Sequence, residues 1–197
     1  MTQTNTEPFE IIAGPLNVYF APTGTPFPGI TETDQQIQDD GTWTPVGFTE
    51  GGVNVAHPQT IVELRADQVT GPIKAVRSEE ALEITFDIAS LTLENYALAL
   101  NQAIDGPGTA AGDKHVALYR GGFQVETLAL LCRQGHLSPY ADAPLSFEVP
   151  VCFQAGAPTD SFTKDNKAVL AVSFHALVDP DRVDDESSFG FVRGGTA

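Results

Sequence analysis

Positive charge is scarce in this chain of 197 residues. Lysine and arginine together number 10 against 26 aspartates and glutamates, so the formal net charge is −16. No lysine or arginine occurs before Arg65. Proteins that hold nucleic acid by its phosphates, and proteins that lie on anionic membrane surfaces, depend on basic side chains. The composition therefore argues against both kinds of binding.

Cysteines and long apolar runs are also few. The only two cysteines, Cys132 and Cys152, each lie in an apolar segment with the pattern of a strand. We expect two buried free thiols, and a disulfide stays open as an alternative if these strands are neighbours. No apolar run approaches the roughly 20 residues of a membrane-spanning helix. The first residues have neither the basic nor the apolar segment of a signal peptide.

Motifs that carry chemistry are missing as well. The sequence contains no P-loop, no nucleophile elbow, no His-Glu-x-x-His and no Cys-x-x-Cys. The four histidines lie far apart, and the acidic residues from Asp179 onward do not follow the spacing of a calcium-binding loop. The sequence therefore predicts no catalytic, cofactor-binding or metal-binding residues, and a protein that is not an enzyme.

Alternation of apolar and polar residues is the pattern that the sequence does contain. Residues 82–88 (LEITFDI) alternate with the period of a half-buried strand. Residues 145–153 alternate too, with Pro150 on the polar face, which predicts an edge strand or a bulge. The run 167–178 is largely apolar on both faces, which favours burial on two sides or a subunit contact. Further strands are expected within 14–21, 42–47, 51–56, 60–66, 114–119 and 126–133, and residues 73–78 are expected to lead into the strand at 82–88.

One convincing helix follows the strand at 82–88. From Leu93 to Leu100 the apolar residues fall on one helical stripe, and Thr92 is placed to cap its N-terminus. The sequence DGPG at 105–108 is expected to stop this helix. Almost everything else has the pattern of strand or loop, so we expect a mainly β fold, a β-sandwich or barrel with one flanking α-helix.

The chain is expected to form a single domain with extensions. Residues 1–13 form an N-terminal arm, residues 14–178 the β domain, and residues 179–197 an acidic and then glycine-rich C-terminal extension. Two long loops are expected inside the domain, at about 22–41 and 57–78. The first of them has no expected regular structure, and loops of that kind and length are commonly functional or flexible.

Two segments carry a resemblance to a known family. Residues 43–53 (WTPVGFTEGGV) follow the first strand, and residues 67–73 (DQVTGPI) precede the strand and the lone helix. In this order they resemble the major tail proteins, or tail tube proteins, of long-tailed bacteriophages. The resemblance covers roughly residues 14–101, and the second half fits only as further strands. The loop at 22–41 is longer than the family pattern, and the C-terminal extension is an addition to it.

The resemblance implies a structural virion protein. Subunits of this family form hexameric rings that stack into a tail tube around a tape-measure protein, with tail terminator and distal tail proteins as further partners. Double-stranded DNA later passes through without specific binding, which suits an acidic subunit because DNA is densely negative. The implied location is the virion tail, after assembly in the cytoplasm of the bacterial host, with no membrane contact.

Two sets of residues follow as candidates. The resemblance predicts that the loop at 57–78 contacts an adjacent subunit or ring, and a second hypothesis has a polar row of the 82–88 strand facing the lumen of the tube. The candidate contact residues are Asp67, Gln68, Gly71, Pro72, Lys74 and Arg77, and the candidate lumen residues are Glu83, Thr85 and Asp87.

Two alternatives stay open at this point. The nearer one is a tube protein of a contractile tail, a type VI secretion system or a gene-transfer agent, which would share the fold. The other belongs to a different class, a stand-alone β-sandwich module that binds a ligand or decorates a virion. Such a module is expected to be monomeric or dimeric and to carry an exposed aromatic platform.

Overall fold

The computed structural model describes residues 14–102, 104–105, 114–118, 123–134, 144–160, 162, 164–182 and 187–194. In chain order the elements are β1 (Leu16–Pro22), α1 (Asp34–Asp39), β2 (Thr44–Pro45), β3 (Thr49–Ala56), β4 (Gln59–Arg65), β5 (Pro72–Glu80), β6 (Glu83–Ile88), α2 (Leu93–Leu100), β7 (Ile104–Asp105), β8 (His115–Val116), β9 (Leu128–Gln134), β10 (Ser146–Gln154), β11 (Leu170–Ala176), a 3-10 helix (Pro180–Arg182) and β12 (Phe191–Arg193).

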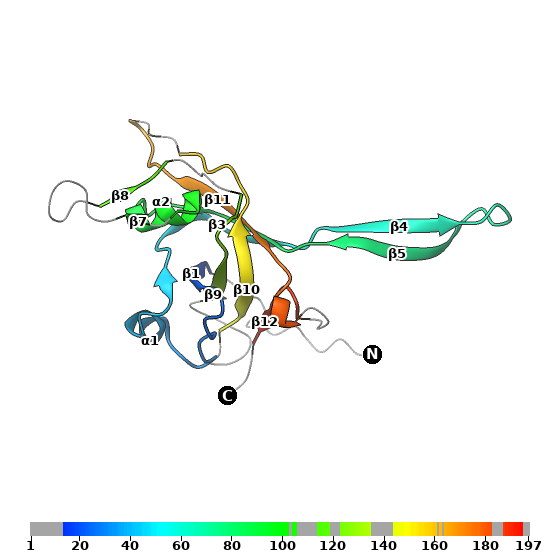
Figure 1. The fold of residues 1–197 in the computed structure, drawn as a ribbon, viewed down its shortest axis with the longest axis horizontal. Coiled ribbons are helices and arrows are strands. Elements are labelled where there is room, and N and C mark those ends of the chain that lie inside the picture. The colour runs from blue at the N-terminus through cyan, green and yellow to red at the C-terminus, as the bar shows by residue number, and fades with distance from the viewer. Residues whose placement is uncertain are drawn as a thin grey trace.

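Most of these strands belong to one antiparallel sheet of eight strands (Figure 1). Its order is β2-β1-β9-β10-β11-β6-β3, and β12 pairs with β10 beside this path. β4 and β5 form a separate two-stranded hairpin, and β7 pairs with β8. The fold is therefore mainly β, as the sequence predicts.

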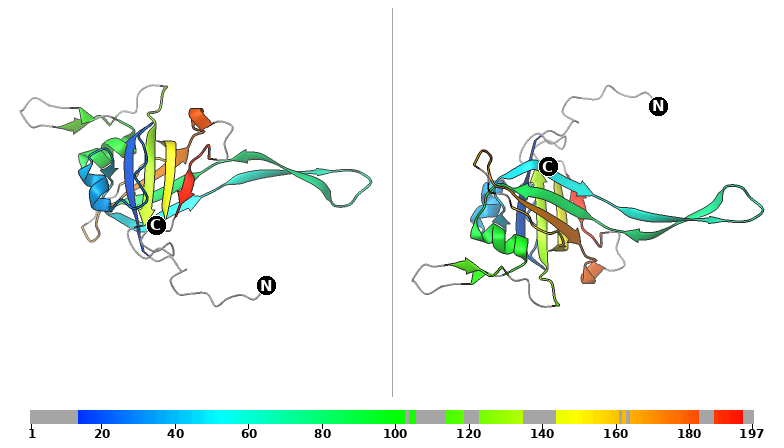
Figure 2. Two further views of the ribbon diagram at one scale, coloured as in Figure 1. Left: turned by 90° about the horizontal axis from the view of Figure 1, so that it is seen from below. Right: turned by 90° about the horizontal axis from the view of Figure 1, so that it is seen from above.

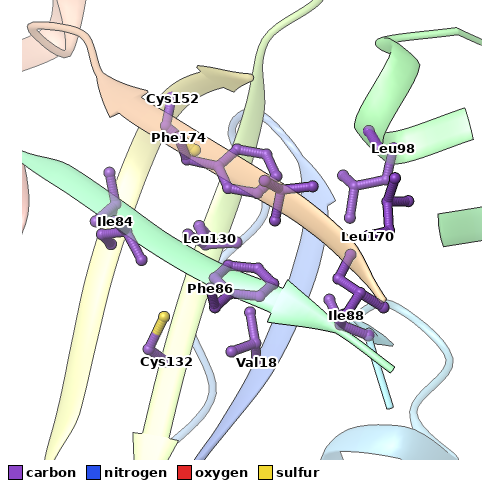
Figure 3. Packing of buried hydrophobic residues seen from close by; sticks show 14 of the residues in the cluster. Val18, Ile84, Phe86, Ile88, Leu98, Leu130, Cys132, Cys152, Leu170 and Phe174 are labelled. Atoms are coloured by element: carbon purple, nitrogen blue, oxygen red, sulfur yellow. The ribbon is translucent and has the colours of Figure 1, made fainter. Parts of the chain in front are cut away.

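The sheet bends so that its two halves face each other around one core. Figure 3 shows side chains of β6 and β11 lying opposite side chains of β1 and β9, with Leu98 of α2 at one side. Phe86 and Phe174 stack at the centre with ring centroids 5.8 Å apart. The two halves thus pack like a sandwich, which confirms the expected class.

α2 is the expected helix. Thr92 Oγ1 accepts a hydrogen bond from the Asn95 N–H at 3.3 Å, as a capping residue does. The buried Asn95 side chain donates to the Val46 carbonyl at 2.8 Å and ties the helix to the segment after β2. The helix ends at Leu100, where the predicted apolar stripe ends. It stops before the DGPG sequence at 105–108, because Asn101 adopts a left-handed conformation with φ of 58° that closes its last turn.

The predicted loop at 22–41 contains a second helix. α1 begins after Thr33, whose hydroxyl accepts from the Gln36 N–H, while the Gln36 side chain accepts from the Thr33 N–H at 2.8 Å. These reciprocal bonds form a capping box. Ile37 of α1 then packs with Trp43 against the face of β1 and β9 that points away from the main core. The expected loop is thus a structured cover for the sheet.

Arginine side chains hold this cover in place. The Arg133 guanidinium donates to the carbonyls of Ile30, at 2.8 Å, and of Glu32 and Gly29. Arg193 donates to the Pro28 carbonyl at 3.2 Å and pairs with the buried carboxylate of Glu148 at 2.5 Å. Burial raises the pKa of Glu148, and the charge of Arg193 opposes that rise.

β10, β11 and β8 agree with the expected strands to different degrees. The register of β10 against β9 shifts between Val149 and Cys152, which confirms the bulge expected at Pro150. β11 is covered on one face only, because Ala171 is exposed on the other, so the predicted burial on two sides is wrong within this chain. The strand expected at 114–119 shrinks to β8, and residue 119 lies outside the described part.

Both cysteines are buried and free, as expected. Burial raises the pKa of both thiols, that of Cys132 to about 12. The predicted N-terminal arm, residues 1–13, lies outside the described residues. β12 lies within the expected C-terminal extension and pairs with β10, so that part of the extension belongs to the sheet.

Candidate assembly surface

β4 and β5 project away from the rest of the molecule. We call residues 59–80 the projecting hairpin, and the remaining sheet with its two helices the body. Figures 1 and 2 show the hairpin reaching far beyond the body on the side opposite α2. It continues the paired strands β3 and β6, and the Ala81 N–H donates to the Pro58 carbonyl at 3.0 Å across its base. The hairpin is therefore a direct extension of one end of the sheet.

Every residue of β4 and β5 is exposed to solvent. Six large apolar side chains of the hairpin, one of them in its turn, have exposed fractions between 42% and 58%, namely Ile61, Val62, Leu64, Val69, Ile73 and Val76. A two-stranded hairpin without a covering layer is marginally stable in water. Contiguous exposed apolar surface is typical of protein interaction sites.

The two faces of the hairpin differ in chemistry. Val62 pairs with Val76 and Leu64 with Lys74, so these four side chains share one face. We call this the apolar face. The opposite face carries the pairs Ile61–Arg77 and Glu63–Ala75, and an ion pair joins Glu63 to Arg65 at 3.0 Å. The apolar face thus holds one cation among aliphatic side chains, whereas the other face is mixed.

The predicted contact residues all lie on this hairpin. Asp67, Gln68 and Gly71 lie in the turn between the strands, and Pro72 begins β5. The remaining two lie on opposite faces.

Lys74 belongs to the apolar face, and no ion pair of its ammonium group occurs among the described residues. Arg77 lies on the other face, where it donates to Gln59 at 2.9 Å and pairs with Glu80 at 3.1 Å. The structure therefore brings the predicted set onto one element, although it divides the set between two faces.

Val62, Leu64 and Val76 were missed as candidates. Apolar residues occur at both odd and even positions of β4, so the alternation that marks a half-buried strand is blurred there. The one sequence signal for this surface was the loss of apolar-polar alternation in β4, next to the turn at 69–72. A strand with apolar residues on both faces needs cover on both faces, and none of the described residues supplies it.

The predicted lumen residues lie on the body. Glu83, Thr85 and Asp87 share the face of β6 that points away from the core, and all three are partly exposed. Their neighbours across the strands include Asn54 and Ser173, which flank Thr85. His175 approaches Glu83 with 3.6 Å between Nε2 and Oε1. The structure thus places the three residues in one polar row, and its position in an assembly stays a prediction.

No family model and no curated protein matches this chain. Within the described ranges, no three histidine, cysteine, aspartate or glutamate side chains gather as a metal site. No helix of that part of the chain is long and apolar enough to cross a membrane. A function can therefore be inferred only from the exposed surfaces and their chemistry.

Proposed function

We propose that this protein is the tail tube subunit of a long-tailed bacteriophage, a structural protein whose hexameric rings stack into a conduit for the genome. The single observation that carries the proposal is the projecting hairpin. It exposes six large apolar side chains to water. In an assembly of identical chains, a second subunit is the partner that would cover them. Assembly would cover this surface and stabilise the hairpin.

The edges of the sheet support the same reading. The sheet ends in β2 on one side and β3 on the other, and neither has a strand on its outer side among the described residues. Open edges invite pairing with further strands, and natural proteins cover them or close them by assembly. A closed ring of subunits removes such edges from solvent.

The charge of the chain suits a conduit for DNA. With a net charge of −16, the subunit repels the phosphate backbone, so DNA would pass without being held. The row of Glu83, Thr85 and Asp87 is the candidate lining, because exposed charges act over only about 8–10 Å at physiological salt. The further proposed partners are the tape-measure, terminator and distal tail proteins, and the proposed location is the virion tail.

Negative-stain electron microscopy of the purified full chain tests the proposal. We expect rings or tubes once the protein is concentrated, together with a large species in size-exclusion chromatography. Scattered small particles at high concentration would contradict the proposal and favour a stand-alone module.

A further inference from the structure

We infer that the apolar face of the projecting hairpin docks, in the assembly, into a groove on a second copy of this chain. The groove lies between α2 and the strands β1 and β9. The inference rests on the proposed self-assembly and names the partner surface of the hairpin.

The groove is open, mainly apolar and not filled by any of the residues that the structure describes. It measures about 500 Å³, a size typical of binding sites. Phe20 and Pro22 of β1, Ala97 and Leu98 of α2, and Leu128 of β9 supply its apolar lining. Its walls are regular elements that are anchored in the core, and a rigid, pre-formed site keeps the entropy cost of binding low.

The groove and the hairpin lie on opposite sides of the molecule. Both views in Figure 2 place α2 on one side of the body and the hairpin on the other. A hairpin therefore cannot reach the groove of its own chain. A contact between two different surfaces is heterologous, so each copy that donates a hairpin still offers its own groove. Such contacts generate closed rings or continuing helices.

The charges of the two surfaces are complementary. Lys74 is the single cation of the apolar face. Among the described residues that line the groove, the two charged ones are both acidic, Glu94 of α2 and Glu126 before β9, and both are exposed. Lys114 lies 3.9 Å from Glu94, at the outer limit of an ion pair, and no cation pairs with the Glu126 carboxylate among the described residues. The ammonium group of Lys74 thus matches the groove in sign.

The aliphatic side chains of the apolar face are suited to the apolar lining of the groove. Val62 and Leu64 lie two positions apart on β4, which corresponds to about 7 Å along the strand, and Val76 lies beside Val62. The opposite face of the hairpin, with Glu63, Arg65 and Arg77, would place charges against this apolar lining and leave them poorly solvated. The apolar face is therefore the one that docks.

Charge reversal tests the inference. Lys74→Glu places like charges together in the docked state, so we expect the concentration needed for tube formation to rise more than about tenfold. Adding Glu94→Lys and Glu126→Lys to the same chain restores opposite charges, and we expect recovery to near the wild-type concentration. Arg65→Glu is the matched control on the other face of the hairpin, and it should leave tube formation nearly unchanged. Circular dichroism of each variant confirms that the body is folded.

Disulfide trapping gives a second, independent measurement. Lys74→Cys combined with Glu126→Cys should give a ladder of covalently linked chains when assembled tubes are oxidised, whereas Arg65→Cys combined with Glu126→Cys should not. The native thiols stay out of the reaction because both are buried and carry raised pKa values.

The outcomes separate this inference from the proposed function. Equal effects of Lys74→Glu and Arg65→Glu, a failure of the triple variant to recover, or tubes without a ladder would each overturn the docking site while tube formation stands. Absence of tubes from the wild-type chain would overturn the proposed function and the docking site together.

Discussion

The body and the projecting hairpin are made of the same kind of strand, yet they are stabilised differently. β5 and β6 follow each other with only Ala81 and Leu82 between them. In β6 every second side chain is buried, whereas in β5 no side chain is. Hydrogen bonding along the ladder continues through both, but burial of apolar surface stops at the base of the hairpin. Strand pairing is thus not sufficient for local stability, because most of the favourable free energy comes from burial.

The contrast implies that stability varies along the molecule. We therefore expect the body to open mainly by global unfolding and the hairpin of an isolated subunit to open locally at a lower free-energy cost.

Removing the hairpin should abolish assembly and spare the body. The Pro58 carbonyl already accepts a hydrogen bond from Ala81 N–H, which is the bond that closes a two-residue turn. Replacing residues 59–80 by Asn-Gly should therefore leave the thermal midpoint of the subunit within a few degrees of its starting value. No rings or tubes should form. Tubes of ordinary appearance from this variant would mean that the hairpin is dispensable.

Truncating a central side chain of the body should have the opposite effect. Phe174 is 1% exposed and stacks on Phe86, so Phe174→Ala should lower the free energy of unfolding by about 3–5 kcal/mol in urea titration. Phe48→Ala is the matched control, because Phe48 is 82% exposed, and it should cost less than about 0.5 kcal/mol. Similar losses for both variants would contradict the described core.

The cover over β1 and β9 should depend on Arg133. Arg133→Met leaves the carbonyls of Gly29, Ile30 and Glu32 without their donor. We expect a loss of about 1–3 kcal/mol in the free energy of unfolding. Arg65→Met, on the exposed hairpin, should change it by less than about 0.5 kcal/mol. If the two variants lose equally, the arginine does not anchor this segment.

The smallest effect should be a pH dependence of opposite sign for a buried and an exposed carboxylate of the body, Glu148 and Glu94. Burial raises the pKa of Glu148 in the folded state, so its contribution favours folding at acidic pH and is lost as pH rises through that value. The stability of wild type relative to Glu148→Gln should therefore fall as pH rises above the ordinary glutamate pKa of about 4.

Glu94 serves as the control for that pH dependence. A hydrogen bond from its own backbone N–H lowers the pKa of Glu94, so wild type should gain stability over Glu94→Gln as pH rises from acid. Slopes of the same sign for both pairs would contradict the assignment.

Local patterns in the sequence predicted the elements with clear signals. β6 and α2 appear where alternation changes to a helical stripe, and the capping role of Thr92 is confirmed. α1 was missed because a helix of six residues with one buried residue, Ile37, has no measurable periodicity. Only the capping box beginning at Thr33 marked it. The helical stripe ended at Leu100, as α2 does, but Asn101 was not identified as the residue that closes the helix, because the Gly-Pro sequence downstream is a more visible stop signal.

The sequence predicted the position of the candidate assembly surface but not its exposure. The turn at 69–72 and its two flanking strands could be read from residue types alone. Their complete exposure could not, because it depends on where the body ends, and that follows from long-range pairing of β11 with β6 and of β6 with β3. Face assignment also required the register, which puts Lys74 beside Leu64. Without knowledge of that register, the apolar face cannot be distinguished from the mixed face.

Trp43 is an intrinsic fluorescence probe of the body. It is the single tryptophan of the chain, is buried beside Phe27, and donates from Nε1 to the Pro26 carbonyl at 3.1 Å. Its fluorescence therefore reports on the seating of the 22–41 segment against the sheet and carries no direct signal from the hairpin. The emission spectrum can accordingly follow unfolding of the body in free subunits and in assembled material alike.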